Sequence, residues 1–228
     1  NSEAVLARFS FIGSKGDQGL RYYIADLHFF HRALNDKMDV RGFEDVEEMN
    51  EYMISQWNKK VKKRDEVVVL GDFSWGNGRD TAEIIERLNG RIFLIRGNHD
   101  RFLDDKDFDS SVFGWVREYA ELSDNRRKVV LSHYPIVFYN GQYRRDEQGK
   151  PKTFMLHGHI HNTQDRDDLD VFIDFMATRK HVSIGGELEN VPCQIINCFC
   201  VDSDYEPMTL DEWIELDEKR KRRRRENK

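Results

Sequence analysis

The chain has 228 residues, of which 34% are charged and 39% hydrophobic, and its formal net charge is −6. This composition is typical of a soluble globular protein and excludes a disordered chain, and no run approaches the roughly 20 consecutive apolar residues that span a bilayer. The charge is uneven, because residues 218–228 hold eight Lys or Arg against two Glu. The remainder is acidic and should repel long polyanions, so non-specific binding of duplex nucleic acid by the body is not expected.

In the first half of the chain, strands and helices are predicted to alternate. Short apolar or β-prone runs predict strands at 21–25, 66–70 and 91–95. Apolar side chains at helical spacing predict helices at 46–61 and 80–88. The alternation indicates a parallel sheet with right-handed crossovers, in which the polar residues that follow the strands meet at one edge.

The second half is predicted to be rich in strands, which indicates a second sheet. The runs concerned are 115–121, 128–132, 153–156, 181–184 and 194–201. Near the end, Thr209 and Glu212 form a capping-box pattern that predicts a helix from Leu210 to about Glu218. We expect a single domain over residues 1–218, followed by a basic and mobile tail over 219–228.

The three cysteines, Cys193, Cys198 and Cys200, are odd in number and lack the CxxC spacing of a thiolate metal site. They predict small apolar side chains in a buried strand rather than a disulfide framework, and they fit a reducing compartment. The first residues, NSEAVLARFS, lack the basic start and the apolar stretch of a signal peptide. These features favour a cytoplasmic location.

Five polar clusters each follow a run that is predicted to be a strand. They are Asp26-x-His28, Gly71-Asp72, Gly97-Asn98-His99-Asp100, Ser132-His133 and Gly158-His159-x-His161. Residues two apart on an extended chain point to the same side, so each spaced pair can face one cleft, and the glycines permit tight backbone there. Carboxylate and imidazole ligands without thiolate suit Mn, Fe, Co, Ni or Zn, and the set suffices for two ions if one carboxylate is shared.

This series of motifs, D-x-H, G-D, G-N-H-D, H and G-H-x-H in that order, resembles the calcineurin-like metallophosphoesterase superfamily over roughly residues 22–161. The resemblance implies an α/β fold, a four-layer α/β/β/α sandwich with two mixed sheets, here without a large cap domain. It also implies two sets of metal ligands, which are Asp26, His28, Asp72 and His161 for the first ion and Asp72, Asn98, His133 and His159 for the second. Asp72 would bridge the ions, and His99 would contact the scissile phosphate and protonate the leaving oxygen.

Hydrolysis of a phosphate ester is the chemistry that such a site would perform. Two close cations share a hydroxide, lower its pKa and hold the phosphate for in-line attack, so the nucleophile needs no side-chain base. A protonated imidazole at His99 then suits the departing alkoxide. We expect two divalent transition-metal ions, with Mn favoured over Fe, Ni, Co or Zn, and a small phosphomonoester or phosphodiester substrate, a nucleotide included.

One departure separates this chain from many phosphoprotein phosphatases of the superfamily, which extend G-D to G-D-x-x-D-R-G. Here the sequence continues as Gly71-Asp72-Phe73-Ser74-Trp75-Gly76, without the Asp that orients the histidine or the Arg that binds phosphate. A phosphoprotein phosphatase is therefore disfavoured. Arg32, Arg41, Arg96, Arg101 and Arg144 are candidates for a replacement phosphate-binding cation, although each fits a solvated surface charge better.

Two alternative functions stay open. A nuclease acting on single-stranded or structured nucleic acid would use the same chemistry, but it needs a basic or aromatic groove that the acidic body does not indicate. A non-catalytic metal-binding scaffold would have lost His99 or several ligands, and all are present. No membrane partner is expected, and the sequence sets no oligomeric state.

Several residues near the motifs are interpreted as structural. His31, His157 and His181 are expected to be structural, although His31 lies close enough to the first motif to touch substrate. Phe29, Phe30, Phe73 and Trp75 flank the motifs and could stack on a base or an aryl leaving group, but we expect packing. The polar loop Tyr139–Lys152 either overhangs the cleft or is a solvated connection.

Overall fold

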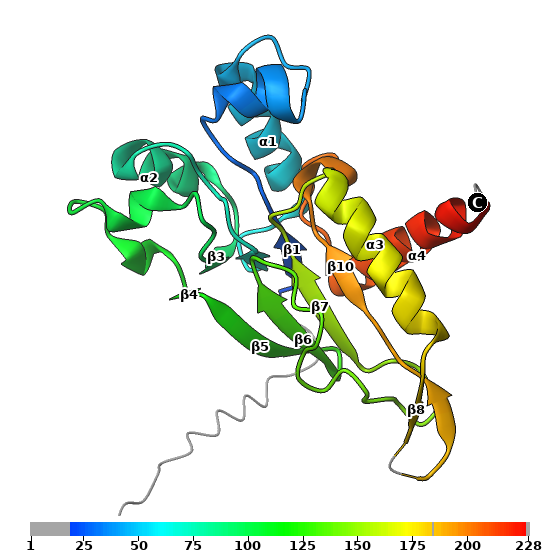
Figure 1. Ribbon diagram of the computed structural model, residues 1–228. Coiled ribbons are helices and arrows are strands. Elements are labelled where there is room, and N and C mark those ends of the chain that lie inside the picture. Colours follow the sequence, from blue (N-terminus) through cyan, green and yellow to red (C-terminus); the bar gives the residue numbers. More distant parts are fainter. Residues whose placement is uncertain (1–18, 184, 227–228) are drawn as a thin grey trace, which may run out of the picture.

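The computed structural model describes residues 19–183 and 185–226, which form two packed sheets with helices outside (Figure 1). The first sheet has the strand order β1-β2-β3-β4, and all its pairings are parallel. Its strands are Arg21–Ile24, Glu66–Val69, Arg91–Ile95 and Val116–Arg117. The first three lie where the apolar runs predicted them.

The second sheet has the order β10-β7-β6-β5, with β5 antiparallel to β6 and the other pairings parallel. Its strands, in chain order, are β5 (Tyr119–Asp124), β6 (Arg127–Ser132), β7 (Thr153–His157) and β10 (Ile195–Asn197). A separate hairpin pairs β8 (Lys180–Val182) with β9 (Leu188–Asn190). The predicted α/β sandwich is confirmed.

Three layers of buried apolar side chains hold the sandwich together. The central strands of the sheets are therefore buried on both faces. On β2, Val67 and Val69 face α1 (Val46–Lys60) and α2 (Gly78–Arg87), whereas Val68 faces the second sheet. The outer face of the second sheet packs against α3 (Gln164–Thr178). Burial on both faces explains why these strands read as continuous apolar runs rather than as alternating ones.

The short helices of the structure lie in the loops that connect these elements. They are the π-helix η1 (Leu34–Met38) and the 3-10 helices η2 (Arg101–Asp104), η3 (Ser110–Val112) and η4 (Cys200–Ser203). Two of them lie just after polar motifs, η1 after β1 and η2 after β3.

In the second half, a predicted strand is wrong and a helix was not predicted. The run 115–121 is not one strand, because the chain leaves the first sheet after β4 and enters the second sheet as β5. Helix α3 was not predicted, although Leu169, Phe172, Ile173 and Met176 have helical spacing and pack in its core. The acidic residues between them mask the pattern in a region otherwise rich in strands.

The last helix, α4 (Leu210–Glu226), begins at the predicted capping box. The Thr209 N–H donates to Glu212 Oε2 at 2.7 Å, and the Glu212 N–H donates to Thr209 Oγ1 at 3.4 Å. The expectation that this helix frays after about Glu218 is wrong, since it continues to Glu226.

Ion pairs explain why the basic end of α4 stays helical. Arg220 pairs with Asp202 at 3.1 Å, and Arg224 pairs with Asp170 and Asp174 of α3. Residues 1–18 and 227–228, which belong to the expected domain and tail, lie outside the described residues. Across the described ranges, no helix has both the length and the apolar character needed to cross a membrane.

Candidate active site

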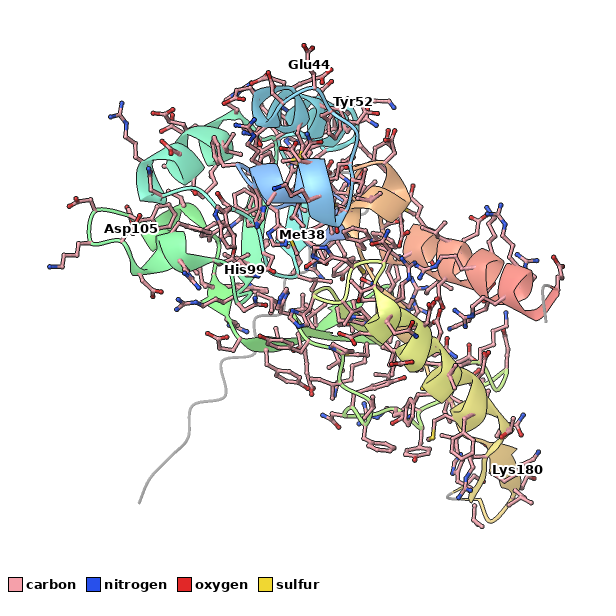
Figure 2. All side chains as sticks on the ribbon, turned by 45° about the horizontal axis from the view of Figure 1, so that its top comes forward. Met38, Glu44, Tyr52, His99, Asp105 and Lys180 are labelled. Carbon is pink, nitrogen blue, oxygen red and sulfur yellow. The ribbon has the colours of Figure 1, made fainter. Side chains whose placement is uncertain are left out.

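All five polar motifs lie just beyond the carboxyl ends of strands. Asp26 and His28 follow β1, Asp72 follows β2, Asn98 and His99 follow β3, His133 follows β6, and His159 and His161 follow β7. Figure 2 shows His99 near this edge, in that view between the segments that carry Asp105 and Met38. The edge where parallel strands end is the expected place for a ligand site in an α/β fold.

The side chains at this edge form two groups, and within each group the ligand atoms lie within 4.8 Å of one another. The first group is Asp26, His28 and His161, and the second is Asp72, His133 and His159. Asn98 joins the second group, because its Oδ1 lies 2.9 Å from His133 Nε2. The structure therefore brings together all seven side chains that the sequence nominated as ligands.

A single carboxylate oxygen connects the two groups. Asp72 Oδ2 lies 3.4 Å from His28 Nε2, in the first group, and 3.5 Å from His133 Nε2, in the second. His28 Nε2 also lies 3.3 Å from His161 Nε2. Oxygen and imidazole nitrogen atoms thus converge on a small buried volume, as the ligands of a metal ion do.

The backbone at these residues is held in a conformation that L-amino acids rarely adopt. Five of the seven candidate ligands have positive φ angles, namely Asp26 (59°), His28 (51°), Asp72 (53°), His159 (72°) and His161 (42°). Left-handed backbone at residues other than glycine costs roughly 1–3 kcal/mol each and clusters at functional sites. The strain indicates that the placement of these side chains, rather than stability, determines the local structure.

Glycines next to the ligands allow the loops to approach closely. A Cβ atom on Gly97 would lie 2.2 Å from the backbone nitrogen of Asp72, and one on Gly158 would lie 2.7 Å from Asp26 Oδ2. Gly71, at φ +91°, would place a Cβ 2.3 Å from His133 Nδ1. The tight backbone that the motif glycines predicted is therefore present.

The first group is supported by a buried ion pair that the sequence did not reveal. His161 Nδ1 is 2.9 Å from Asp39 Oδ1, and Asp39 Oδ2 accepts from Arg41 at 3.0 Å. Arg41 also donates to the carbonyl oxygens of Asp26 (2.9 Å) and Leu27 (2.7 Å). Arg41 is thus fully engaged and buried, so it is not a phosphate-binding cation for substrate.

The second group is supported by backbone groups. The buried Asp100 carboxylate accepts from the N–H groups of Phe73 (2.7 Å), Gly97 (2.8 Å), Asp72 (3.0 Å) and Ser74 (3.4 Å). This holds together the loops that follow β2 and β3. His133 Nδ1 lies 2.8 Å from the Leu70 carbonyl oxygen, which requires that nitrogen to carry its proton.

The hydrogen bonds made by the other ring nitrogen of each histidine test whether these residues fit a metal site. His133 and His161 each have Nδ1 held by an oxygen, at Leu70 and Asp39, which leaves Nε2 to face the ligand group. A metal-ligating histidine is oriented in this way by its other ring nitrogen. The donor set, carboxylate, imidazole and amide oxygen, also suits divalent transition metals.

Burial and neighbouring charges shift the protonation of the ligands. Burial opposes the charge on His133, but the carboxylates of Asp72 and Asp26 outweigh it and raise the pKa of His133 to about 9. Burial likewise opposes ionisation of Asp72, but His133 and His28 hold its pKa well below the usual value. Burial raises the pKa of Asp26 to about 6. The buried carboxylates of Asp26 and Asp72 therefore favour the binding of positive charge at this cluster.

His99 stands beside the ligand groups rather than within them. Its backbone N–H donates to Asp72 Oδ1 at 2.8 Å, and its ring centroid lies 5.5 Å from that of His28 and 4.8 Å from that of Trp75. Its buried Nδ1 atom has no hydrogen-bond partner in the described part of the chain. Ring packing, not a second carboxylate, fixes its orientation.

The other histidines and the remaining arginines have separate surroundings. His157 is buried with Nδ1 2.8 Å from the Gly158 carbonyl oxygen, and His181 packs against Tyr143. Arg32 pairs with Asp36 and Arg96 with Asp104. Arg144 lines a hollow between β5, β6 and the loop Tyr139–Lys152, away from the ligand groups.

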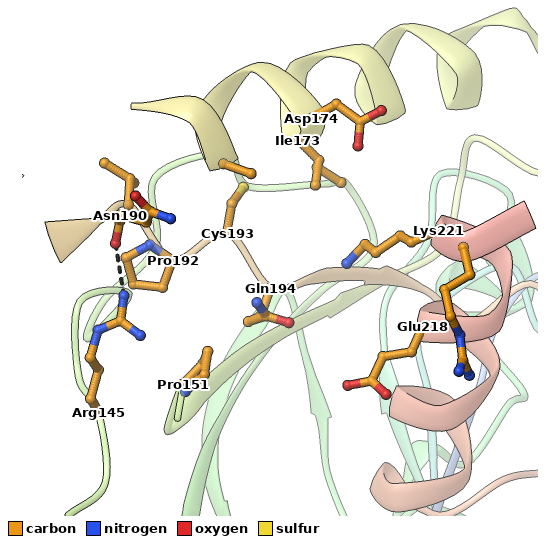
Figure 3. Close-up of a pocket in the computed structure, with 13 residues that line it drawn as sticks. Arg145, Pro151, Ile173, Asp174, Asn190, Pro192, Cys193, Gln194, Glu218 and Lys221 are labelled. Carbon is orange, nitrogen blue, oxygen red and sulfur yellow. Dashed lines mark hydrogen bonds between the residues drawn. The ribbon is translucent and has the colours of Figure 1, made fainter. Parts of the chain in front are cut away.

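A further hollow, with a volume of about 430 Å³, lies between α3 and α4 (Figure 3). Ile173, Cys193 and Lys221 are among its lining residues, and no member of the two ligand groups lines it. Burial raises the pKa of the Cys193 thiol to about 11, so this thiol is protonated and inert near neutral pH. All three cysteines are buried and free, as the sequence predicted, but the prediction that they lie in a strand is wrong, because β10 ends at Asn197 and Cys200 begins η4.

The fold and the paired histidine–carboxylate groups define a metallophosphoesterase. The chain belongs to the calcineurin-like phosphoesterase family, whose sequence model matches residues 22–190. An uncharacterized protein from Methanocaldococcus jannaschii is 32% identical over 202 residues, which cover 88% of this chain and 92% of that protein.

Other similar proteins are more distant in sequence. The Gene 66 protein of Mycobacterium phage L5 is 28% identical over 165 residues, covering 62% of this chain and 77% of the phage protein. Among solved structures, a protein of unknown function from Aquifex aeolicus matches with a TM-score of 0.57 and 22% identity. That match covers 87% of this chain and 100% of the other, and it supports the fold alone.

Proposed function

We propose that this metallophosphoesterase is a dinuclear hydrolase of small phosphomonoesters or phosphodiesters. The observation that carries the proposal is the position of Asp72 Oδ2, 3.4 Å from His28 Nε2 and 3.5 Å from His133 Nε2. One oxygen between the imidazoles of two ligand groups is the arrangement that a carboxylate shared by two ions requires. The proposed ligands are Asp26, His28, Asp72 and His161 for the first ion and Asp72, Asn98, His133 and His159 for the second.

When bound, two divalent ions supply an activated water and neutralise charge on the phosphate. Oxygen and imidazole ligands without thiolate suit Mn, Fe, Co, Ni or Zn, and Mn(II) is the ion that we favour among them. The side chains then have two tasks, to position the phosphate and to supply a proton to the leaving oxygen. His99 suits the second task, because it lies against His28 without belonging to either ligand group.

The charges around the site favour a small substrate over a nucleic acid. Arg41 is buried in its ion pair, and the carboxylates of Asp36 and Asp104 engage Arg32 and Arg96. Arg101 is the remaining candidate for contact with phosphate, and its charge lies close enough to help lower the pKa of His99, which burial already lowers. Among the five candidate arginines, all in the described part of the chain, Arg101 alone is neither paired nor away from the site, and one arginine can hold one phosphate group. A nuclease groove instead presents cations along a strand.

The direct test combines metal analysis with hydrolysis of p-nitrophenyl phosphate and its bis-ester, with Mn(II) added. We expect close to two ions per chain and turnover of at least one ester. His99→Ala should lower kcat by about 10²- to 10⁴-fold, the usual contribution of a general acid, while the metal content stays near that of the wild type. Loss of metal together with activity would show that His99 is a ligand, and a wild-type chain without activity toward either ester would favour the non-catalytic scaffold.

A further inference from the structure

Trp75 differs from the phenylalanines that flank the metal motifs. Phe29 and Phe73 are 0% exposed and pack in the core, as expected, whereas Trp75 is 46% exposed. Packing therefore explains the phenylalanines and leaves the tryptophan unexplained. A large apolar ring that is exposed beside a binding site, rather than elsewhere on the surface, is typical of a residue that contacts a ligand.

The position of Trp75 is fixed by its backbone. Its N–H donates to the Phe29 carbonyl oxygen at 2.8 Å, next to a bridge that pairs Phe29 with Ser74. Ser74 is in turn held by the Thr81 hydroxyl, which donates to Ser74 Oγ at 2.8 Å. The ring is thus presented from a rigid segment, which lowers the entropy lost when a ligand binds.

One part of the Trp75 ring rests on two histidines. Its centroid is 4.1 Å from that of His31 and 4.8 Å from that of His99. His31 is itself buried, with Nδ1 accepting from the Leu34 N–H at 3.2 Å, so it supports the indole from beneath. The exposed part of Trp75 therefore borders the proposed proton donor directly.

A second exposed ring borders the other ligand group. Tyr134 is 49% exposed, its centroid lies 4.4 Å from that of His159, and its hydroxyl lies 3.4 Å from Asn98 Oδ1. Trp75 and Tyr134 thus border the site on its His99 side and its His159 side. Only the His99 side would meet the leaving group.

We propose that Trp75 forms a subsite for a planar aromatic ring, a nucleobase or an aryl group, in the alcohol portion of the phosphate ester. The proposal rests on the proposed function, because it needs His99 to face the leaving oxygen. A group attached to that oxygen lies next to His99, and the surface it meets there is the exposed indole of Trp75. Stacking on an indole accepts any planar π-system, so the subsite selects the ring and not its hydrogen-bonding pattern.

The test compares pairs of phosphate esters. Both members of a pair release a primary alcohol, but only one member carries an aromatic ring. AMP is compared with ribose 5-phosphate, and benzyl phosphate with cyclohexylmethyl phosphate, which has a ring of similar size that is not planar. For the wild type, kcat/KM should favour the aromatic member of a pair by roughly 5- to 150-fold, the range for stacking of one base. Preference in the first pair alone identifies a nucleobase, and preference in the second alone identifies an aryl group.

Trp75→Ala should reduce this preference to within about threefold of unity, and Trp75→Phe should retain most of it, since a smaller π-system remains. Phe175→Ala is the matched control, because Phe175 is also an exposed aromatic side chain but lies on α3. Its preference should equal that of the wild type. Circular dichroism and metal content of each variant check that the fold and the ligand groups are intact.

A binding measurement gives a readout that does not depend on turnover. Adenosine carries no phosphate, and it should quench tryptophan fluorescence of the wild type more than that of Trp75→Phe. Of the other three tryptophans, Trp57 and Trp213 are fully buried, and Trp115 is partly buried against the core between the sheets. Equal quenching, together with an unchanged kcat/KM preference in Trp75→Ala, overturns the proposed subsite. If no ester is hydrolysed while metal is bound, the proposed function fails instead, and adenosine quenching still reports on Trp75.

Discussion

The two ligand groups are supported by different parts of the chain. The first group depends on side chains, because Asp39 fixes His161 and Arg41 fixes both Asp39 and the backbone at Asp26. The second group depends on backbone, because Asp100 collects N–H groups from the loops after β2 and β3. Removing Asp39 takes a contact from the His161 side chain alone, whereas removing Asp100 takes away the contacts that hold two loops together.

Asp100→Ala should have the largest effect. Each buried N–H group that it strands costs roughly 1–3 kcal/mol, so the free energy of unfolding should fall by about 3 kcal/mol or more. Urea denaturation of metal-free protein measures this directly. Because Asp72 and Asn98 lie on the loops concerned, calorimetric titration with Mn(II) should show the second ion weakened more than the first.

Asp104→Ala is a suitable control for this variant, since Asp104 is an acidic side chain four residues on that makes an exposed ion pair with Arg96. It should change the unfolding free energy by less than about 1 kcal/mol. If Asp100→Ala changed the unfolding free energy as little as Asp104→Ala does, the strands alone would hold the two loops. The proposed difference in support between the two ligand groups would then be wrong.

Asp39→Ala should have an intermediate effect, and it should act on the first ion. Without Asp39, His161 loses the partner that fixes its ring and leaves Nε2 facing the ligands. Loss of such a partner typically weakens metal binding by about 10- to 100-fold. In a Mn(II) titration, the dissociation constant of the first ion should rise by this factor and that of the second should change by less than about threefold.

Asp36→Ala provides the comparison, because Asp36 lies in the same segment but pairs with the exposed Arg32. Its metal affinities should match those of the wild type. Equal weakening of both ions in Asp39→Ala would mean that the groups are not supported separately.

The proposed ligands could be recognised in the sequence because each follows a strand whose apolar run is easy to recognise. Asp26, His28, His159 and His161 lie at one edge, as the motifs predicted. The extended backbone assumed for their i, i+2 spacing is wrong, because all four residues have positive φ angles. Asp100 was part of a motif, but nothing in the sequence showed that its carboxylate receives backbone N–H groups.

Residues that support the proposed ligands through hydrogen bonds were harder to predict. Asp39 and Arg41 lie in an irregular segment after η1 that has no periodicity, so their burial leaves no sequence signal. Arg41 was therefore grouped with surface cations, and Trp75 was grouped with core aromatics. For both residues, the sequence shows the type of side chain. It does not show how exposed the side chain is, because exposure depends on tertiary packing.

Cys200 tests how much of the first group's support comes from Arg41 alone. Its thiol donates to the Asp26 carbonyl oxygen at 3.1 Å, the same atom that accepts from Arg41 Nη2 at 2.9 Å. Burial raises the pKa of this thiol to about 12, so it stays a donor near neutral pH, but a thiol is a weak one. Cys200→Ala should therefore lower the unfolding free energy by only about 1 kcal/mol and change the first ion's dissociation constant by less than about threefold.

Cys198→Ala is matched to this variant in size and burial, but Cys198 packs between the sheets, and its thiol lies 3.9 Å from the Ile196 carbonyl oxygen rather than at Asp26. Both variants should lose similar stability, because both leave a small cavity. Calorimetric titration with Mn(II) separates them. A tenfold loss of affinity for the first ion in Cys200→Ala alone would make the thiol a principal support of Asp26, and the first group would then be supported by three side chains instead of two.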